Sequence, residues 1–593
     1  MIKMKKNLLF LLMALGCYSL CTAQTNPVKI SPKANHFQYN VYEYGDVIDT
    51  STTHILLNGN DYIIMDEEEN GKFVPGYAKQ LLVVKLNQDS AYEHVHFEGD
   101  ANEILYEVAS SFSRDDIQFD TAKINGLTRY TCSINSNKLE FYVQDYASDI
   151  TPIPYYGRFH GILVSYWRNG QKRLELNKTF VDKTIKNELQ NPFVVGPFQR
   201  ISEKEFSKMK RQKMIITHRI FDDEQLCWGK KDDHINTPQW GHGNIPYDSV
   251  LHFAGGTLIL KKVNLPALPK HYQTFIELHQ RSNGDAYDRT GSVFVIPNNY
   301  LGPTFFDGIN HHPDSLPIIY GRDGQKYQGM VMKRWLDGET LLSYQPPVEL
   351  MRFFTPFGVG HFNERVKIDG LEWADEAYYK QEVTDLSGYL QGDGIVIGVW
   401  IGNYDGGGHK VTMDIKSYPG DYLWDDDSSE GEDVFCQSLF NTCNVLEMAG
   451  QNYGKIFGSD SLSVEFDLVN PQNARLRYIS TGHGGWGGGD EFNPKTNTLL
   501  IDGVPMFSHT PWREDCGCYR QLNPVSGNFW NGVSSSDYSR SGWCPGTATQ
   551  PVYFDLSQLK PGKHKLTIAI PQGEPQAGSF SFWSVSGVLI TEP

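Results

Sequence analysis

Helical periodicity is scarce in this sequence of 593 residues. The short, highly charged segment Ser202–Lys213 has it, with Phe206 and Met209 as its apolar residues. Elsewhere, short runs rich in Val, Ile, Tyr and Phe are separated by Gly, Asn, Asp and Pro, as in strands joined by turns. This scarcity excludes an all-helical protein and indicates an all-β one, with a length that calls for several domains.

Basic residues and long apolar runs are also few. Lys and Arg total 53 against 70 Asp and Glu, so the formal net charge is −17 at pH 7. That balance disfavours nucleic acid and anionic membranes as partners. Beyond the N-terminal segment no stretch is long and apolar enough to span a bilayer, so we expect no transmembrane segment.

The N-terminus has the pattern of a signal peptide. Three lysines in the first six residues precede the apolar run Leu8–Leu15, and Cys21-Thr-Ala23 supplies small residues for cleavage. We therefore expect residues 1–23 to be removed and the protein to be exported, to the periplasm or to the medium. A lipoprotein acylated at Cys17 is the less favoured alternative, because the residues before it are in a poor order for that signal.

Cysteine is infrequent, with nine in the whole chain, and an exported protein uses it in disulfides. Cys436 and Cys443 enclose a small loop, and Cys518 and Cys544 bracket a segment rich in Ser, Gly and Asn, so we expect two disulfides, Cys436–Cys443 and Cys518–Cys544. Cys516-Gly-Cys518 has neither a CxxC partner nor a nearby His pair, which disfavours a metal site. The odd number of cysteines after the signal peptide leaves at least one thiol unassigned.

An internal repeat indicates the architecture. Val383–Trp400 is similar to Val552–Ala569: in each, Asp-Leu-Ser begins a turn, a glycine-containing loop follows, and an alternating strand comes next. We interpret the repeat as two related, side-by-side jelly-roll β-sandwiches, preceded by a separate β-rich N-terminal domain. The expected division is 1–23 (signal peptide), 24–195 (N-terminal accessory domain), 196–213 (connector), 214–417 (first jelly roll) and 418–593 (second jelly roll).

Two glycine-containing loops follow strand-like runs. Thr481–Glu491 comes after Ala474–Ser480 and has six glycines in eleven residues, around His483, Trp486 and two carboxylates. Glycine at this density costs backbone entropy that an ordinary turn does not require, and it lets the backbone approach a ligand closely. Arg281–Arg289, about two hundred residues earlier, is a second strand-end loop with acids and an aromatic residue. We infer one site shared by two domains.

Two motifs, one in each expected sandwich, are more specific than any single residue. They are Gly284-Asp-Ala-Tyr-Asp-Arg-Thr-Gly-Ser-Val-Phe-Val295 and a block from Arg475 to Gly546 that holds Glu491, Gly517-Cys518, Asn523-Pro524 and Arg540-Ser-Gly-Trp-Cys-Pro-Gly546. Together, and in this order, they resemble the bacterial peptide-N-glycosidase F family, the amidases that remove N-linked glycans from glycoproteins. The N-terminal domain is similar to the added domain of the family's longer members.

The resemblance implies hydrolysis of the amide bond between asparagine and the innermost N-acetylglucosamine of N-glycans, which releases the glycan and converts Asn to Asp. The family's catalytic aspartate falls on Asp288, and its essential glutamate in the second domain falls on Glu491. Positions that contact substrate fall on Tyr287, Arg289, Arg540 and Trp543. The implied partners are N-glycosylated peptides and glycoproteins, and we expect a monomer.

These residues suit direct attack by water, because no Ser/His/Asp or Cys/His arrangement with supporting context is visible. Asp288 would act as general base or orient the water, and Glu491 would position the water or help to protonate the leaving nitrogen. Arg289 or Arg540 would stabilise the oxyanion and keep the carboxylates ionised. Nothing in this route requires a metal or a cofactor.

Aromatic side chains would supply the sugar contacts, since the C–H faces of a pyranose are apolar. We expect Trp486, Trp543 and Tyr287 to stack on sugar rings. His483 would form a hydrogen bond with a sugar hydroxyl or orient Glu491. A simpler explanation for Trp543 is that it packs on the neighbouring disulfide.

One departure from the family favours a second interpretation. Where the family has a third acidic residue, Gly398, Trp400 or Gly402 stands here, and Asp405 is the nearest acid. The alternative function is therefore a non-catalytic glycan-binding protein on the same scaffold. Copper chemistry on paired sandwiches is disfavoured, because the histidine groups fall in different domains and in the wrong order; they are His94-Val-His96 and His311-His312.

Overall fold

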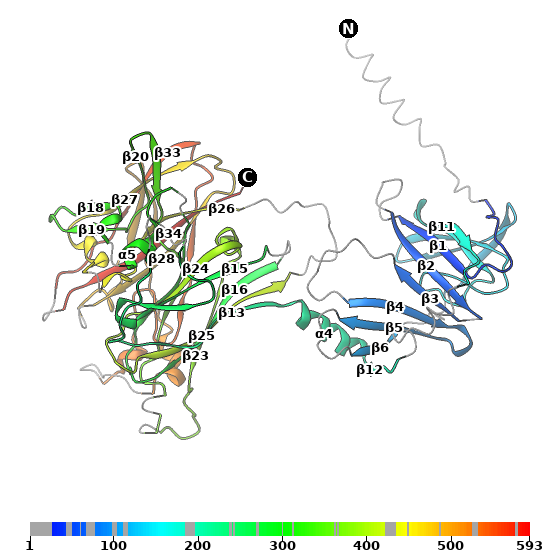
Figure 1. Cartoon of the computed structure of the whole chain (residues 1–593), viewed down its shortest axis with the longest axis horizontal. Helices are drawn as coiled ribbons and strands as arrows, with labels where there is room; N and C mark the ends of the chain where they lie inside the picture. Colours follow the sequence, from blue (N-terminus) through cyan, green and yellow to red (C-terminus); the bar gives the residue numbers. More distant parts are fainter. Residues whose placement is uncertain are drawn as a thin grey trace, which may run out of the picture. The chain divides into compact units, whose positions relative to one another are not determined.

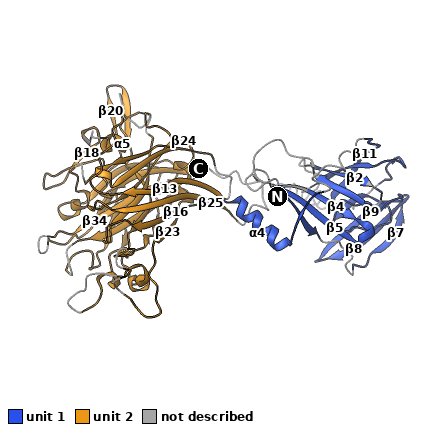
Figure 2. Ribbon diagram, turned by 60° about the horizontal axis from the view of Figure 1, so that its bottom comes forward, with its two compact units in different colours: residues 1–215 blue, residues 216–593 orange. Residues whose placement is uncertain are grey.

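The structure, a computed structural model, divides into two compact units, residues 1–215 and 216–593 (Figure 2). It describes residues 26–42, 50–59, 61–66, 78–97, 104–110, 117–183, 196–236, 240, 244–267, 272–298, 301–310, 313–360, 363–364, 367–420, 434–447, 450–484, 488–524, 532–575 and 579–592. The expected signal peptide, with Cys17 and the cleavage after Ala23, lies outside these residues. None of the described helices is long and apolar enough to cross a membrane.

The first unit is built on one long sheet, whose strands lie in the order β12-β6-β5-β4-β3-β2-β1-β11-β10-β9-β8-β7 (Figure 1). The strands are β1 (His36–Tyr42), β2 (Thr50–Asn58), β3 (Asp61–Asp66), β4 (Ala78–Lys85), β5 (Ser90–Phe97), β6 (Leu105–Ser110), β7 (Asp120–Ile124), β8 (Leu127–Ile134), β9 (Asn137–Gln144), β10 (Ile162–Arg168), β11 (Gln171–Phe180) and β12 (Gln199–Ile201). Phe37, Tyr39 and Phe141 lie in its main apolar core. The predicted β-rich N-terminal domain is confirmed.

The predicted helix is present as α4 (Glu203–Met214). A capping box begins it: the Ser202 hydroxyl accepts a hydrogen bond from the Glu205 N–H (3.2 Å), and the Glu205 carboxylate accepts one from the Ser202 N–H (2.8 Å). Phe206 is the buried residue of the helix and packs in a cluster with Val95 of β5. The helix is therefore fixed to the sheet of its own unit.

The second unit contains two jelly rolls. In the first, one sheet has the order β13-β25-β16-β23 and the other β14-β15-β24-β17-β22-β31; in the second, the orders are β26-β34-β28-β32 and β27-β33-β29-β30. The first roll consists of β13 (Ile216–Leu226), β14 (Val250–Phe253), β15 (Leu258–Leu265), β16 (Tyr272–Ser282), β17 (Thr290–Ile296), β22 (Val348–Phe354), β23 (Ala377–Glu382), β24 (Gly392–Ile401) and β25 (His409–Pro419), and it also carries α5 (Phe305–Ile309) and the hairpins β18 (Ile318–Tyr320)–β19 (Lys326–Gln328) and β20 (Lys333–Asp337)–β21 (Thr340–Tyr344).

The second roll follows in the chain and returns to the first. Its strands are β26 (Phe435–Asn441), β27 (Leu462–Leu468), β28 (Arg475–His483), β29 (Asn497–Ile501), β30 (Val504–His509), β31 (Ala548–Thr549), β32 (Val552–Asp555), β33 (Gly562–Ala569) and β34 (Phe582–Thr591). Of these, β31 joins a sheet of the first roll, where Thr549 pairs with Arg352 of β22. The two rolls thus share a sheet.

The internal repeat corresponds to the same step in each roll. Val383–Trp400 leads from the end of β23 in one sheet to β24 in the other, and Val552–Ala569 leads from β32 to β33 in the same way. The predicted pair of jelly rolls is confirmed. The boundary at residue 417 stays a prediction, because both rolls belong to one compact unit.

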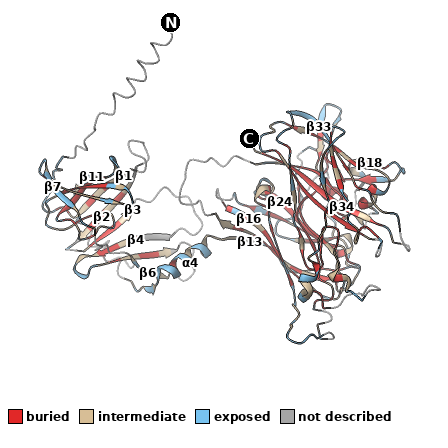
Figure 3. Ribbon diagram, turned by 180° about the vertical axis from the view of Figure 1, so that it is seen from behind, coloured by how far each residue is buried: buried red, intermediate tan, exposed pale blue. Residues whose placement is uncertain are grey.

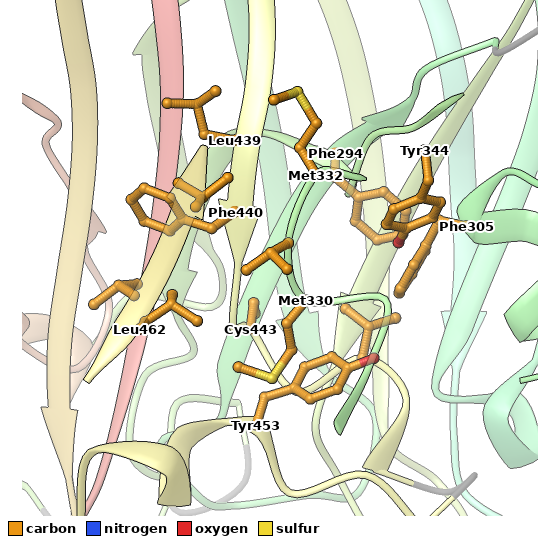
Figure 4. Close-up of a cluster of buried hydrophobic side chains, with 14 of the residues drawn as sticks. Phe294, Phe305, Met330, Met332, Tyr344, Leu439, Phe440, Cys443, Tyr453 and Leu462 are labelled. Carbon is orange, nitrogen blue, oxygen red and sulfur yellow. The ribbon is translucent and has the colours of Figure 1, made fainter. Parts of the chain in front are cut away.

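An apolar core common to both rolls holds them together. Buried residues run along the strands of both (Figure 3). Figure 4 shows part of one continuous cluster, with Phe294, Phe305 and Tyr344 from the first roll, Leu439, Phe440, Tyr453 and Leu462 from the second, and Met330 and Met332 beside them. Burial of one such side chain stabilises by about 1.5–3 kcal/mol, so a shared core fixes the loops of one roll relative to those of the other.

The disulfide of the second roll differs from the prediction. It joins Cys516 to Cys544, whereas Cys518 is an exposed thiol. The predicted partner of Cys544, which is Cys518, and the observed partner, Cys516, both lie in the 3-10 helix Cys516–Leu522. In such a helix, residues two apart point in different directions, so the buried Cys516 faces Cys544 and Cys518 faces solvent. The predicted Cys518–Cys544 pairing is wrong by two residues, while a disulfide still fits an oxidising compartment.

The predicted Cys436–Cys443 disulfide is also wrong, and both residues are free thiols. The segment between them is the extended strand β26 (Phe435–Asn441) rather than a small loop. An extended chain rises by about 3.3 Å per residue, which separates the two cysteines far beyond the reach of a disulfide. Cys443 is buried in the shared apolar core instead (Figure 4).

Candidate active site

Two strand-end loops, one from each roll, form the candidate active site. The first connects β16 to β17 and the second follows β28. Gly284 in the first loop has φ +152°, and a Cβ there would lie 2.7 Å from the Asp405 Oδ1. Gly484 in the second has φ +82°, and a Cβ there would lie 2.1 Å from the Phe580 carbonyl oxygen. Both loops therefore need glycine for a close backbone approach.

Arg540 brings together the two predicted catalytic carboxylates. Its Nη1 lies 3.3 Å from the Asp288 Oδ2 and also donates a hydrogen bond to the Glu491 Oε1. Its Nη2 donates to the Ser535 carbonyl (2.7 Å). The guanidinium side chain is 2% exposed, while the two carboxylate side chains are 18% and 20% exposed. One buried cation thus contacts two carboxylates, and both carboxylates remain accessible to water.

The charges at this centre are unequal in number. Burial raises the pKa of Asp288, against the attraction of Arg540. Burial also raises the pKa of Glu491, and the negative charge of Asp288 adds to the increase. Two carboxylates with one cation in a partly desolvated site favour retention of a proton. The pair can therefore take up and release a proton nearer to neutral pH than ordinary carboxyl groups.

Two aromatic rings pack against the guanidinium group of Arg540. Its guanidinium carbon lies 4.3 Å from the ring centroid of Trp543 and 5.0 Å from that of Phe492. Trp543 in turn stacks on Phe354 with the centroids 4.2 Å apart, and its indole N–H donates to the Gly482 carbonyl (3.0 Å). Trp543 is only 3% exposed, so the structure places it as a support for Arg540, with little surface left for a sugar.

The adjacent acids Asp490 and Glu491 have different surroundings. Asp490 is fully buried, and its carboxylate accepts hydrogen bonds from the Trp583 indole (2.8 Å) and the Gly573 N–H (3.0 Å). The Glu491 carbonyl accepts a hydrogen bond from the Ser541 N–H (2.9 Å), next to Arg540. Asp490 therefore anchors the loop, and Glu491 presents its side chain to Arg540.

His483 lies inside the junction between the rolls and is 4% exposed. It stacks on Phe582 with the centroids 4.7 Å apart, and its Nε2 lies 2.8 Å from the Thr481 Oγ1. Burial lowers its pKa to about 3, and the positive charges of Arg352 and Arg540 contribute. The imidazole is therefore neutral near pH 7. Trp486, the second aromatic residue predicted in this loop, lies outside the described residues.

Tyr287 and Arg289 flank Asp288 in different ways. Tyr287 is 56% exposed at the rim, with its ring edge-on to Phe357. Arg289 is paired with Asp285, its Nε lying 2.7 Å from the Asp285 Oδ2. Arg289 pairs with Asp285, whereas Arg540 contacts both predicted catalytic carboxylates, so Arg540 is the better placed of the two to stabilise an oxyanion formed between them.

Asp285 was not predicted as a site residue, although it belongs to the same motif as Asp288. It is 2% exposed, and burial alone would raise its pKa. The His409 imidazole, with its Nε2 3.6 Å from the Asp285 Oδ2, and the hydrogen-bonded Arg289 guanidinium overcome that effect and lower the pKa to about 2. Asp285 is therefore ionised at any working pH and holds Arg289 in place.

This gives a testable prediction for Asp285→Asn. The native pKa of about 2 lies below the ordinary value of 3.8, so ionised Asp285 stabilises the fold above about pH 4, by roughly 2 kcal/mol. That contribution is lost as the pH falls through the native pKa. We expect urea unfolding to show a destabilised variant at pH 6 and a smaller difference from the parent at pH 3. An equal difference at both pH values would contradict this role.

The positions aligned with the family's third acid have structural roles here. Trp400 is 5% exposed, and a Cβ on Gly398 would lie 2.6 Å from Phe294. The Asp405 Oδ1 accepts hydrogen bonds from the N–H groups of Gly407 (2.7 Å) and Gly408 (3.0 Å), which shapes its own loop. The aligned positions thus carry no acid, and Asp405, the nearest one, is bonded to its own loop.

A cavity of about 230 Å³ lies between the rolls close to this centre, and we call it the junction cavity. It is lined by Thr290, Trp400, Gly402, Tyr404, Asn444, Glu447, Asn452, Gly454, Lys455, Phe580, Phe582 and Ser584. Tyr404 and Phe580 are 53% and 39% exposed. Burial and the negative charge of Glu447 raise the pKa of Tyr404 to about 12. Sequence patterns do not reveal this cavity, because its residues come from separate segments.

Comparisons with known proteins bear on the family of this chain. The family models for Peptide-N-glycosidase F match residues 217–417 (N terminal) and 452–590 (C terminal). Two solved structures of PNGF-II are each 34% identical to this chain over 94% of its length. For the structure in space group C2, the TM-score is 0.61 and 98% of the PNGF-II chain is covered. For the structure in space group P21, the TM-score is 0.60 and the whole PNGF-II chain (100%) is covered. A solved peptide-N(4)-(N-acetyl-β-D-glucosaminyl) asparagine amidase is 17% identical, over 64% of this chain and 96% of its own, with a TM-score of 0.40.

A comparison with curated proteins finds no match. The family models nevertheless cover both jelly rolls, and the likeness to PNGF-II extends over nearly the whole of both chains. The chain therefore belongs to the peptide-N-glycosidase F family.

Proposed function

We propose that this protein hydrolyses the amide bond between asparagine and the innermost N-acetylglucosamine of N-glycans. The observation that carries the proposal is the sharing of one buried guanidinium, that of Arg540, by Asp288 from the first roll and Glu491 from the second. Such a centre can both accept and donate a proton beside a positive charge, which amide hydrolysis needs. Membership of the family supports the same activity.

The reaction follows from the three side chains. Asp288, when ionised, accepts a proton from water as the water oxygen attacks the side-chain carbonyl carbon of the glycosylated asparagine. Arg540 offsets the negative charge that develops on the carbonyl oxygen. Glu491, when protonated, donates to the amide nitrogen as the C–N bond breaks. The products are an aspartate side chain and a glycosylamine, which then hydrolyses to ammonia and the free sugar.

The junction cavity is the proposed site for the sugar. Thr290, which lines it, is two residues from Asp288, and the cavity ring Phe582 stacks on His483 behind the catalytic loop. Tyr404 and Phe580 offer exposed ring surface, and Glu447 offers a polar group beside Tyr404. Rings with adjacent hydrogen-bonding groups are typical of small-ligand pockets.

Substitution of the cavity rings should weaken binding more than chemistry. We expect Tyr404→Ala and Phe580→Ala each to raise KM for a glycopeptide by about five- to tenfold, with kcat changed little, because the lost contact is made before and during the reaction. Tyr320→Ala is the matched control, since Tyr320 is 68% exposed and does not line the cavity. Steady-state kinetics that show a fall in kcat at constant KM would place these rings in the chemical step instead.

The direct test is mass spectrometry of an N-glycopeptide incubated with the protein in ¹⁸O-labelled water. The proposal requires a deglycosylated peptide whose asparagine has become ¹⁸O-labelled aspartate. A peptide that keeps one N-acetylglucosamine would show cleavage between sugars instead. An untouched peptide, with several glycan types offered, would favour the glycan-binding alternative.

Export of the protein is proposed as well. It is supported by the Cys516–Cys544 disulfide, which fits an oxidising compartment, and by the N-terminal sequence.

A further inference from the structure

A second, larger cavity of about 580 Å³ lies on the second unit, and we call it the edge cavity. It is lined by Tyr378, Tyr379, Lys380, Tyr478, Ser480, His509, Pro511, Trp512, Arg513, Tyr519, Leu522, Gly542, Gly546, Thr547, Ala548, Thr549, Gln550 and Val552. Its lining includes neither Asp288 nor Glu491 nor any residue of the junction cavity. Its volume is typical of a ligand site, and the proposed chemistry leaves it unused.

The edge of a sheet forms one wall of this cavity. Tyr378, Tyr379 and Lys380 are consecutive residues of β23, and side chains alternate between the two faces of a strand. Three consecutive residues can therefore line one cavity only where the cavity lies along the edge of the strand. β23 is the last strand of its sheet, and in the described part of the chain it pairs with β16 alone.

The direction of the backbone groups on β23 follows from its partner. On β16, the Thr274 carbonyl accepts a hydrogen bond from the Val383 N–H (2.8 Å), and the Thr274 N–H donates to the Thr384 hydroxyl (3.0 Å). Thr274 therefore points its backbone toward β23. Because the direction alternates along an antiparallel pair, Tyr379 of β23 bonds inward, while the N–H and C=O groups of Tyr378 and Lys380 point outward, to the open edge.

The cavity is connected to the candidate active site through one short segment. Arg513, in its lining, exchanges two backbone hydrogen bonds with Arg540: Arg513 N–H to Arg540 C=O (2.8 Å) and Arg540 N–H to Arg513 C=O (3.0 Å). Gly542, two residues after Arg540, also lines the cavity. The edge cavity therefore adjoins the backbone of the residue that joins the two carboxylates.

We propose that the edge cavity binds the polypeptide part of a glycoprotein substrate, as an extended segment added to β23. The inference rests on the proposed function. Outward N–H and C=O groups recognise any extended backbone without regard to its side chains, and pockets beside the edge hold alternate side chains. The partly exposed rings of Tyr378 and Trp512 suit such a pocket. An extended peptide matches the spacing of the outward groups along the edge, whereas the hydroxyls of a sugar do not repeat at that spacing.

Two substrates with the same glycan separate this role from the chemistry. One carries the glycan on a single asparagine blocked at both ends, and the other on an unfolded peptide of about a dozen residues. Lys380→Pro removes one outward N–H, and proline is tolerated on edge strands. We expect it to raise KM for the long substrate about three- to tenfold, as for the loss of one hydrogen bond, with no change for the short one. Lys380→Ala keeps the N–H but loses the ion pair with Glu277 (2.9 Å), so it measures the side-chain effect that the proline variant shares, and the effect of the lost N–H is the difference between the two variants.

Equal losses on both substrates, or none on either, would overturn the proposal. Hydrogen exchange of the unaltered protein gives a second test that needs no variant. A glycan-free peptide of the same sequence should protect the amides of residues 377–382, and the free glycan should not. Protection by the glycan alone would make the edge cavity a sugar site and overturn the proposal. Failure to cleave even the short substrate would count against the proposed function, while the exchange result would still decide the peptide site.

Discussion

Asp288→Asn should abolish nearly all turnover while the protein stays folded. Loss of a general base typically costs about 10²–10⁴-fold in rate, or about 3–5 kcal/mol of barrier. The amide keeps the shape of Asp288 but cannot accept the proton of the attacking water. Glycan affinity should change little, because the junction cavity is formed by other residues. The measurement is kcat and Kd on the same glycopeptide.

The melting temperature separates this effect from unfolding. The pKa of Asp288 is raised by burial, so its ionised form is less favourable in the native protein than in the unfolded chain. Removal of that charge should leave the melting temperature unchanged or raise it slightly. Asp222→Asn, at an aspartate with a 73% exposed side chain, is the control for the substitution itself. Near-normal turnover by Asp288→Asn would remove Asp288 from the mechanism.

The sequence was sufficient for the strand pattern, the helix and the two jelly rolls. These depend on local periodicity and on the repeat with Asp-Leu-Ser, both of which are local patterns. The two carboxylates followed from a resemblance in two motifs. The contact of both carboxylates with Arg540 is a different matter. Arg540 belongs to the second motif, but its position in the sequence does not show that its side chain extends to the loop of the first roll.

Features made by distant segments could not be predicted from the sequence. The disulfide depended on which of two cysteines in a 3-10 helix faces Cys544, and the sequence does not show that direction. The stacking of Phe354, from the other roll, on the ring of Trp543 follows from no local pattern. The junction cavity draws on several separate stretches of chain, so no window of sequence contains it. Such properties arise from packing between rolls, which local patterns do not encode.

Arg540→Met should have the second large effect, on both catalysis and its pH dependence. Removal of an electrostatic stabiliser of this kind costs about 10²–10³-fold in kcat. Arg540 also opposes the rise in pKa of Asp288 and of Glu491. Without it both pKa values should rise further, so the acid limb of the kcat/KM profile should move to higher pH. Arg540→Lys keeps the charge but not the planar fork, so it should restore the acid limb more than kcat.

The stability of Arg540→Met should depend on the protonation of the same two carboxylates. Loss of one partner from a buried ion pair costs about 3–5 kcal/mol when the remaining charges stay ionised. In Arg540→Met the native carboxylates have pKa values above their unfolded ones, so the folded state binds more protons and gains stability as the pH falls through the native pKa values. We expect the melting deficit of Arg540→Met to be larger at pH 8 than at pH 5, whereas Arg322→Met, at an arginine with a 79% exposed side chain, should melt like the parent at both. A deficit independent of pH, with an unmoved acid limb, would mean that Arg540 supports the loops without controlling the two carboxylates.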